Sequence, residues 1–553
     1  MTSARLEMIF TPEGTRRTLD VAPARAETPL TTLLAEIGQS VNMRCGGRGL
    51  CRGCRVRFQR GALRRLADGR VVTVDGEMEI SSCQYAAAPG REAVIAVPAT
   101  SLLGHAAQIA DDFKTRVPVA QAPLFPPPAV AAAIDIGTTT VALLLAEVET
   151  GKILAHASNL NRQITMGDNV VTRINHCMTD KAMIAELQKL IVRETLLPLL
   201  RKACADAGLA LTDIAGLVMS GNTVMLHLLA GVDPSSIGVM PFTPTFLDHR
   251  RLRAGDLHLE NVFPADREVH LLPGLAAYIG ADINAGIIAT GMHYEEGPNL
   301  LIDIGTNGEI VLKHGDRLIG CATAAGPAFE GAGLTWGTRA VEGAIAEIEL
   351  ARAPFSCRLG RINESRGGVC PGICGSAYID FLGEGVRHGL LTTAGRFDDD
   401  FLAENSDIMR NIEGERIFVL LPPGEGQTDP IGISERDISR LLQAKAAIAA
   451  GFSTLLAREG LKPSDIRKLY LAGGFGLHLN VPNAIACGLL PGFVPEQIEV
   501  VGNTSLAGAY MTLLDRGVID ELNLNQDRME AVELNLDPSF EDRYIENLML
   551  EAD

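Results

Sequence analysis

The sequence carries one strand-and-turn pattern twice, and this repeat limits the folds open to the chain. Residues 132–148 read AAIDIGTTTVALLLAEV and residues 300–315 read LLIDIGTNGEIVLKHG, so an apolar stretch ends in Asp-Ile-Gly-Thr before a second apolar stretch begins. Asp135 and Asp303 are 168 residues apart, which is about the size of one domain. The repeat therefore predicts two related structural units within the chain.

Two lobes of alternating strands and helices are the simplest fold for this repeat. Residues 216–222 and 469–476 each give another short apolar stretch that ends in glycine. Residues 183–207 and 434–459 have helical patterns, and Ser434 is suited to cap the second helix. Strands interleaved with helices predict α/β lobes.

The two turns carry groups that a nucleoside triphosphate with Mg²⁺ requires. Glycine lets the backbone approach phosphates, hydroxyl and amide side chains donate hydrogen bonds, and a carboxylate holds metal-bound water. One such turn is weak evidence, whereas two copies at domain spacing are much less easily accidental. No GxxxxGK[ST] motif occurs, which excludes a P-loop. The predicted nucleotide-binding residues in the turns are Asp135, Gly137, Thr138, Thr139, Thr140, Asp303, Gly305, Thr306 and Asn307.

The distribution of charge separates the first hundred residues from the rest. The whole chain has a net charge of −18, whereas residues 1–100 contain 14 arginines, no lysine and 10 acidic residues. An acidic chain is not expected to bind nucleic acid, because phosphates need a basic footprint. The sequence also lacks a long apolar span and a signal-peptide pattern, so we expect a cytoplasmic protein with no membrane partner.

Four cysteines gather in this first module. Cys45, Cys51 and Cys54 lie in a glycine-rich loop with C-x5-C-x2-C spacing, and Cys83 follows at a distance. Four thiolates, three of them in one loop, can hold a two-iron cluster whose sulfurs accept hydrogen bonds from the loop amides. A structural zinc site is the alternative, although zinc modules usually pair two short knuckles. Arginines around the loop, Arg55 among them, are either a solvated basic loop or a docking surface for an acidic partner.

The first module resembles a ferredoxin-type 2Fe-2S β-grasp domain over residues 1–97, and its five-residue first gap resembles the adrenodoxin-type branch. The resemblance implies that the four cysteines bind the cluster. Residues 98–128 contain VPVAQAPLFPPP and are predicted to be a stiff linker. Within the module, the expected elements are a helix at residues 29–37 and strands at residues 4–10, 15–21, 55–58 and 93–97.

From about residue 130 to 515 the chain resembles the ASKHA superfamily, which includes acetate and sugar kinases, Hsp70 and actin. The resemblance implies an α/β region of two lobes, residues 129–295 and residues 296–553 with an acidic tail. It places a nucleotide between them and makes Leu471-Ala-Gly-Gly-Phe-Gly476 the adenosine motif, with Gly473 and Gly474 as binding residues.

The order of ferredoxin-like module, proline-rich linker and ASKHA region resembles the reductive activators of corrinoid proteins. Further matching segments are GNTVMLHLLAG, MPFTP, GPAFEGAG and GICGSAYID. The resemblance implies ATP-dependent transfer of an electron from the 2Fe-2S cluster to the cob(II)alamin of a corrinoid protein in a methyltransferase system, which restores cob(I)alamin. It also implies Mg²⁺, a homodimer and a low-potential electron donor such as a ferredoxin, a flavodoxin or a reductase.

The motifs leave the catalytic group and the reaction class open. Glu309 and Glu330 could each orient a water for ATP hydrolysis, or be solvated or capping carboxylates. Lys445 could approach the nucleotide or lie at the surface, and Cys370 and Cys374 have no assigned role. The alternative functions are a metabolite kinase with a redox-regulatory ferredoxin domain, an electron-donating ATPase for a radical dehydratase, and a non-catalytic iron–sulfur and nucleotide sensor.

Overall fold

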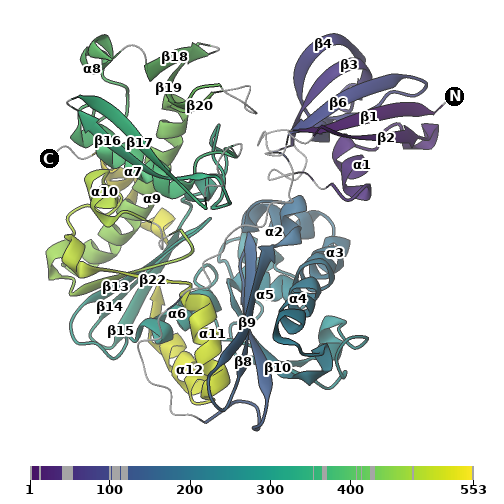
Figure 1. Ribbon diagram of the computed structural model, residues 1–553. Coiled ribbons are helices and arrows are strands. Elements are labelled where there is room, and N and C mark those ends of the chain that lie inside the picture. The colour runs from purple at the N-terminus through teal and green to yellow at the C-terminus, as the bar shows by residue number, and fades with distance from the viewer. Residues whose placement is uncertain are drawn as a thin grey trace. The chain divides into compact units, whose positions relative to one another are not determined.

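The computed structural model describes most of the chain, which divides into two compact units. The first unit comprises Met1–Ala106 and Gln163–Arg173, and the second comprises Ala107–Arg162 and Ile174–Asp553. Figure 1 labels their elements. The described residues are 3–11, 14–39, 41, 54–98, 101, 113, 122–352, 354–363, 370–405, 408–412, 414–423, 430–475 and 479–550.

The first unit contains a mixed sheet with a short helix. The sheet order is β2-β1-β6-β3-β4, and β5 pairs with β3. Strands β1 and β6 are parallel, whereas the other neighbours are antiparallel. Leu6, Met8 and Phe10 alternate with more exposed residues and share a core with Leu33 of the helix. The elements are β1 (Ala4–Thr11), β2 (Thr15–Val21), α1 (Leu30–Glu36), β3 (Arg55–Arg65), β4 (Val71–Ser81), β5 (Tyr85–Ala87) and β6 (Glu92–Pro98).

The first lobe of the second unit is built on a six-stranded sheet in the order β11-β12-β10-β7-β8-β9. Its strands are β7 (Val130–Ile136), β8 (Thr140–Glu147), β9 (Ile153–Leu160), β10 (Ile214–Gly221), β11 (Arg250–Arg253) and β12 (Glu268–Leu271). The chain between β9 and β10 forms α2 (Val170–Thr179), α3 (Ala182–Ile191) and α4 (Leu197–Ala207), and α5 (Thr223–Leu229) follows β10. A π-helical turn at Val192–Leu196 joins α3 to α4, which confirms the helix predicted there.

The second lobe has a sheet of matching topology, in the order β22-β21-β13-β14-β15-β23. Its core path β21-β13-β14-β15 repeats β10-β7-β8-β9 of the first lobe, with one parallel pair and then two antiparallel pairs. The strands are β13 (Asn299–Ile304), β14 (Gly308–His314), β15 (Arg317–Thr323), β21 (Lys468–Ala472), β22 (Ile498–Gly502) and β23 (Met529–Ala531). The sequence repeat thus corresponds to a structural repeat.

Helices and two small sheets surround this second sheet. Ser434 caps α9 by accepting a hydrogen bond from the Asp437 amide, as the sequence predicted. The helices are α7 (Gly375–Arg387), α8 (Asp399–Glu404), α9 (Glu435–Arg458) and α10 (Val481–Ala486). The small sheets pair β16 (Ile345–Arg352) with β17 (Phe355–Arg361), and β18 (Met409–Ile412) with β19 (Glu415–Leu421) and β20 (Ile431–Ser434).

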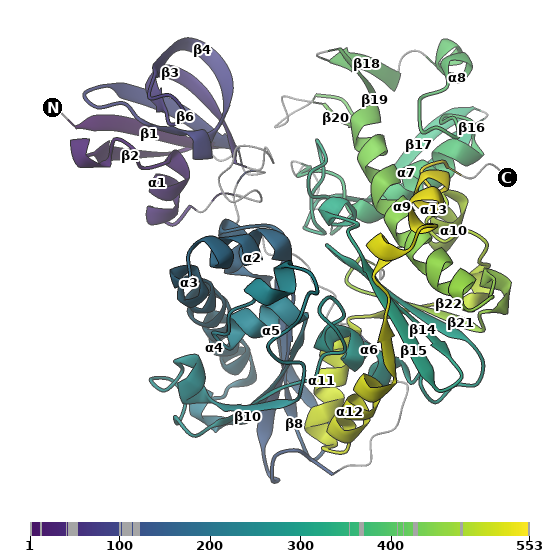
Figure 2. The ribbon, with the colours of Figure 1, turned by 180° about the vertical axis from the view of Figure 1, so that it is seen from behind.

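Two helices cross at the junction of the lobes (Figure 2). They are α6 (Ala281–Thr290), which precedes the second sheet, and α11 (Thr504–Leu514), which packs on β7 and β10 of the first. The crossing is close because Gly508 lies against the Ala285 backbone, where a Cβ atom would be 2.5 Å from the Ala285 carbonyl oxygen. The lobes are therefore joined by helices rather than by a flexible segment.

The tail of the chain forms regular structure within the described residues, although its sequence is weakly patterned. It forms α12 (Val518–Arg528) and α13 (Phe540–Glu546). Lys445 of α9 is fully buried and donates hydrogen bonds to the carbonyls of Asn547 at 2.6 Å and Met549 at 2.7 Å. Both expectations for Lys445 were therefore wrong, because this cation neither reaches the surface nor faces the phosphate turns. It anchors the tail.

The described end of the predicted linker is packed rather than free. Phe125 is buried against Gly216 of β10 and meets the His270 ring edge-on, and the Leu124 amide donates to the Leu513 carbonyl. Residues 102–112 and 114–121 of the linker lie outside the described residues. Residues 122–128 therefore include side chains and backbone packed against the first lobe and α11, and the stiff linker stays a prediction for the rest of residues 98–128.

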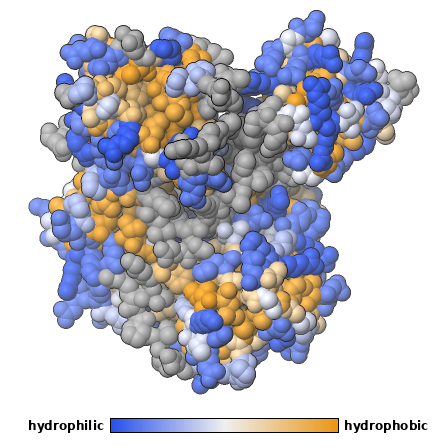
Figure 3. Space-filling view, in the orientation of Figure 1, coloured by the Kyte–Doolittle hydropathy of each residue, from blue (hydrophilic) through white to orange (hydrophobic). Residues whose placement is uncertain are grey.

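Among the described helices, none has the length and apolar character needed to cross a membrane. On the face drawn in Figure 3, hydrophilic residues interrupt the apolar areas of the second unit.

The close crossing of α6 and α11 predicts that Gly508→Ala destabilises the protein. The added methyl group must push the two backbones apart, and overpacking of this kind costs about 1–3 kcal/mol. Thermal unfolding should show a lower Tm for Gly508→Ala, whereas Gln443→Ala on the exposed side of α9 should leave it near that of the unmodified protein. An unchanged Tm for Gly508→Ala would contradict the close packing.

Candidate functional site

The two repeated turns meet at the junction of the lobes. Strand β7 ends beside one turn and β13 beside the other, and the hydroxyl oxygens of Thr139 and Thr306 are 3.1 Å apart. Asn222, at the N-cap of α5, donates to the Thr138 hydroxyl at 2.8 Å. A Cβ atom at Gly137 would lie 2.4 Å from the Thr140 carbonyl oxygen, so this turn requires glycine. The structure thus brings together hydroxyls that the sequence assigned to phosphate binding.

Four carboxylates lie in this junction. They belong to Asp135, Asp282, Asp303 and Glu309, and Asp303 faces Glu309 across the β13–β14 pair. Burial and the nearby Asp303 and Asp135 charges raise the pKa of Asp282 to about 8. Burial and Asp135 raise the pKa of Asp303 to about 7. Among the described residues, no three His, Cys, Asp or Glu side chains are arranged to hold a metal ion directly. A divalent cation would therefore be held here through bound water, which Mg²⁺ commonly retains.

Asp282 and two partners of Asp135 were not predicted from the sequence. Asp282 lies in the first turn of α6, and Asn503 and Ser505 lie at the start of α11. Asn503 Nδ2 donates to Asp135 at 3.0 Å, and Ser505 Oγ donates to it at 2.8 Å. A signal was present, because Gly-Asn-Thr follows a strand at residues 221–223 and again at residues 502–504.

The two candidate water-orienting glutamates differ in environment. Glu330 accepts a hydrogen bond from Thr306 Oγ1 at 2.8 Å and lies 3.8 Å from the Arg339 guanidinium. Glu309 is 8% exposed, and burial together with Asp282 and Asp303 raises its pKa well above the usual range. Glu330 therefore lies next to a turn hydroxyl and an arginine, whereas Glu309 belongs to the carboxylate cluster.

The glycines after β21 lie next to the same cluster. Gly473 has φ +94°, and a Cβ atom there would be 2.8 Å from Asp303 Oδ1. Gly474 has open space around its Cα atom. The backbone can therefore come close to a ligand at this point, as the adenosine motif requires. The last residue of that motif, Gly476, lies outside the described residues.

Two of the four predicted cluster ligands lie within the described residues, namely Cys54 and Cys83. Both side chains are buried, and their contact together with burial raises the pKa of Cys54. Ser82 holds the two segments together, since its amide and hydroxyl both donate to the Cys54 carbonyl, at 3.0 and 2.7 Å. Two adjacent buried thiols fit a shared metal centre. Cys45 and Cys51 lie outside the described residues.

The basic residues beside these cysteines are partly neutralised. Arg55 pairs with Glu79 at 2.6 Å, and Arg57 lies 4.0 Å from Glu77, both across the β3–β4 pair. This arrangement weakens the reading of these two arginines as a docking surface for an acidic partner.

Comparison with known proteins gives matches over most of the chain. Residues 130–295 match a family model described as the RACo middle region, and residues 297–553 match one described as the C-terminal domain of RACo, the ASKHA domain. The corrinoid activation enzyme RamQ of Eubacterium limosum is 33% identical over 75% of this chain and 70% of its own length. A [Co(II) methylated amine-specific corrinoid protein] reductase of Methanosarcina barkeri is 25% identical over 70% of this chain and 71% of its own.

A solved structure resembles the whole chain. It is a reductive activator for corrinoid, iron-sulfur protein, with a TM-score of 0.70 and 28% identity, and the likeness covers 99% of this chain and 98% of the other.

The raised pKa values predict that Mg²⁺ binds more tightly as the pH rises. Protons on Asp282 and Asp303 must leave when the cation binds, so affinity should increase by up to about a hundredfold per pH unit near pH 6, where both are protonated, and by less toward pH 8. Titration calorimetry in two buffers of different ionisation enthalpy measures both affinity and proton release. Asp282→Asn should flatten the dependence, and a pH-independent affinity in the unmodified protein would contradict the shared protons.

The same shifts set the pH dependence of stability without metal. The pKa of Asp282 is higher in the folded protein than in the unfolded chain. The free energy of unfolding therefore falls as the pH rises from about 4 toward the folded-state pKa of about 8. Asp282→Asn should therefore raise the Tm of metal-free protein at pH 8 more than at pH 5.

Proposed function

Because the chain belongs to the RACo family, we propose that it is an ATP-dependent reductive activator of a corrinoid protein. Its reaction passes one electron to the cob(II) form of the corrinoid and restores the cob(I) form used for methyl transfer. The observation that carries this function is the likeness to a reductive activator over 99% of the chain, because that likeness includes the cysteine-containing unit as well as the ASKHA region.

The residues at the lobe junction are suited to hold Mg²⁺ and ATP. Thr138, Thr139 and Thr306 offer hydroxyls to the phosphates, and Asp135 and Asp303 offer carboxylates to metal-bound water. Further phosphate contacts are assigned to the other turn residues, Gly137, Thr140, Gly305 and Asn307. Adenosine contacts are assigned to the two glycines after β21, Gly473 and Gly474.

Glu330 is proposed to orient the water that attacks the terminal phosphate. Its carboxylate already accepts a hydrogen bond from Thr306, and the Arg339 guanidinium lies 3.8 Å from it. Phosphates that enter between the turns replace the contact of Thr139 with Thr306, so Thr306 links their arrival to Glu330. Glu309 is proposed to help hold Mg²⁺ rather than to orient the attacking water.

Cys45, Cys51, Cys54 and Cys83 are proposed to hold a 2Fe-2S cluster in a ferredoxin-like β-grasp unit. The contact of Cys54 with Cys83 and the mixed sheet of the first unit support this assignment. When bound, such a cluster supplies single electrons at about −400 mV if it is of plant type. Cob(I) is a stronger reductant, so ATP must supply the difference.

Domain boundaries, the electron donor and the oligomeric state are proposed from the same family membership. The matched ranges support lobes at residues 129–295 and 296–553, after a unit at 1–97 and a linker at 98–128. The electron donor is a low-potential ferredoxin, flavodoxin or reductase, and the chain forms a homodimer. The net charge of −18 disfavours nucleic acid as a partner.

The function predicts that cob(II) is converted to cob(I) only when Mg-ATP and a low-potential reductant are both present. Visible spectra of an anaerobic mixture with a cob(II)-loaded corrinoid protein follow the conversion directly. Cys83→Ser should abolish it, whereas Cys357→Ser, a thiol on β17, should retain it. Cob(I) formation that proceeds equally without ATP, or that survives Cys83→Ser, would overturn the proposal.

The two glutamates should give separable defects in ATP hydrolysis. Glu330→Gln should lower kcat by about 10²–10³ with little change in KM, because it removes the base but leaves the phosphate contacts. Glu309→Gln should raise the Mg²⁺ concentration needed for half activity. Glu296→Gln, at an exposed position, is the control. Equal losses of kcat in both variants would contradict the assigned roles.

A further inference from the structure

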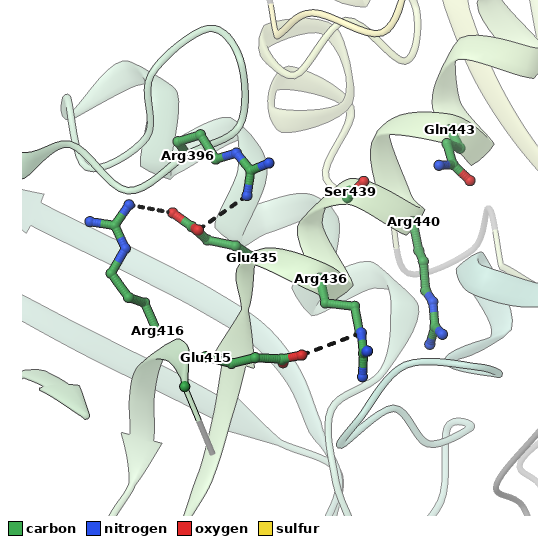
Figure 4. Close-up of a pocket in the computed structure, with 9 residues that line it drawn as sticks. Arg396, Glu415, Arg416, Glu435, Arg436, Ser439, Arg440 and Gln443 are labelled. Carbon is green, nitrogen blue, oxygen red and sulfur yellow. Dashed lines mark hydrogen bonds and ion pairs between the residues drawn. The ribbon is translucent and has the colours of Figure 1, made fainter. Parts of the chain in front are cut away.

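An open hollow on the second lobe is lined almost entirely by charged and polar side chains (Figure 4). Its volume is about 610 Å³, and it lies between the outer side of α9, the start of β19 and the turn before α8. We call it the arginine groove and define it by its lining residues, which are Arg396, Gly414, Glu415, Arg416, Glu435, Arg436, Ser439, Arg440 and Gln443.

The floor of the arginine groove is one exposed stripe of α9. Arg436, Ser439, Arg440 and Gln443 are spaced as i, i+3, i+4 and i+7, so they share a face of the helix, and all four are exposed. Every one of these side chains carries hydrogen-bond donors. Arg436 and Arg440 extend from the helix toward the same side (Figure 4).

The acidic residues of the arginine groove are already engaged. Glu435 accepts from Arg396 at 3.1 Å and from Arg416 at 2.7 Å, and Glu415 lies 3.3 Å from Arg436 Nε. Arg416 also pairs with Asp399 at 2.6 Å, so the four lining arginines face three carboxylates and one positive charge remains in excess on a chain whose net charge is −18. Arg436 meets Glu415 through Nε, and no described residue pairs with its two Nη groups, which form a donor fork. The groove therefore favours a ligand that brings carboxylates.

The polar lining of the arginine groove favours a protein surface over a small molecule as its ligand. Small-molecule sites enclose their ligands and are lined mainly by apolar and aromatic side chains, whereas the described lining of this hollow contains neither kind. A shallow, arginine-rich surface resembles the polar part of a protein interface, where complementary charge steers association.

Helix α9 connects the arginine groove to residues beside the nucleotide site. Asp437 on its buried side accepts hydrogen bonds from the Thr335 amide and hydroxyl at 2.9 and 3.0 Å, and Arg440 on its exposed side donates to the Gly333 carbonyl. Residues 331–338 form the loop between Glu330 and Arg339. A partner that binds the outer side of α9 therefore contacts a helix that fixes the loop beside the water-orienting glutamate.

We propose that the arginine groove docks a carboxylate-rich surface segment of the corrinoid protein and couples its arrival to the nucleotide site. The assignment rests on the proposed function for the identity of the partner. The connection between the arginine groove and the nucleotide site favours the corrinoid protein over the electron donor as the partner. Reduction of cobalt is the step that must coincide with ATP hydrolysis.

The first test uses a hexaglutamate peptide with the full-length protein. Calorimetry should detect binding that is lost at high salt, and a hexalysine peptide should not bind. Arg436→Glu should weaken hexaglutamate binding by at least about fivefold. Arg358→Glu, an 83% exposed position on β17, is the charge-matched control and should bind as the unmodified protein does. Ser439→Glu adds a carboxylate without breaking an ion pair and should reproduce the loss.

The chain's single tryptophan, Trp336, reports the coupling because it lies in the loop held by α9. Hexaglutamate binding should change its fluorescence in the unmodified protein and in Arg358→Glu. Binding without any change would overturn the coupling to the nucleotide site.

The second test measures cobalt reduction against the concentration of corrinoid protein. Both Arg436→Glu and Ser439→Glu should raise the half-saturating concentration by at least about fivefold. An unchanged value would overturn the docking assignment, even if the peptide binds. Failure of the unmodified protein to form cob(I) would instead count against the proposed function, and the peptide experiment would still decide whether the groove binds carboxylates.

Discussion

Repulsion among four carboxylates at the lobe junction is the constraint on which the rest of the second unit depends. Asp135, Asp282, Asp303 and Glu309 are held close together even though burial raises the pKa of all four, and neighbouring carboxylates raise it further for Asp282, Asp303 and Glu309. The crossing helices α6 and α11 supply that restraint, because Asp282 begins one and Asn503 at the cap of the other binds Asp135. A divalent cation relieves the repulsion and therefore changes the energy of the junction itself.

The same junction connects chemistry at the phosphates with more distant parts of the lobe. Thr139 contacts Thr306, Thr306 donates to Glu330, and Glu330 lies beside Arg339. The loop that follows Glu330 is held by α9 through Asp437. A change in the contact between the turns is thus transmitted along hydrogen bonds to a helix with an exposed polar face. This is a physical route by which nucleotide state and partner binding can influence each other.

The division of labour between the units follows from their chemistry. The second unit has carboxylates and hydroxyls suited to a hard cation and phosphates, whereas the first contains adjacent buried thiols suited to a soft metal centre. Ser82 secures the Cys54 and Cys83 segments to each other within the first sheet. The proposed electron transfer needs both kinds of site, because the nucleotide would supply the driving force that the proposed cluster lacks.

Several local elements, the repeat and the ends of the strands at Asp135 and Asp303 could be predicted from the chain alone. They follow from short-range patterns, since apolar periodicity, glycine turns and capping residues act over a few neighbours. Folding was needed to show that Asp282 joins the carboxylates, that Asn503 binds Asp135, and that Lys445 is buried under the tail. Each depends on segments far apart in the chain, and a side chain's pKa or role is set by the charges and carbonyls that folding places around it.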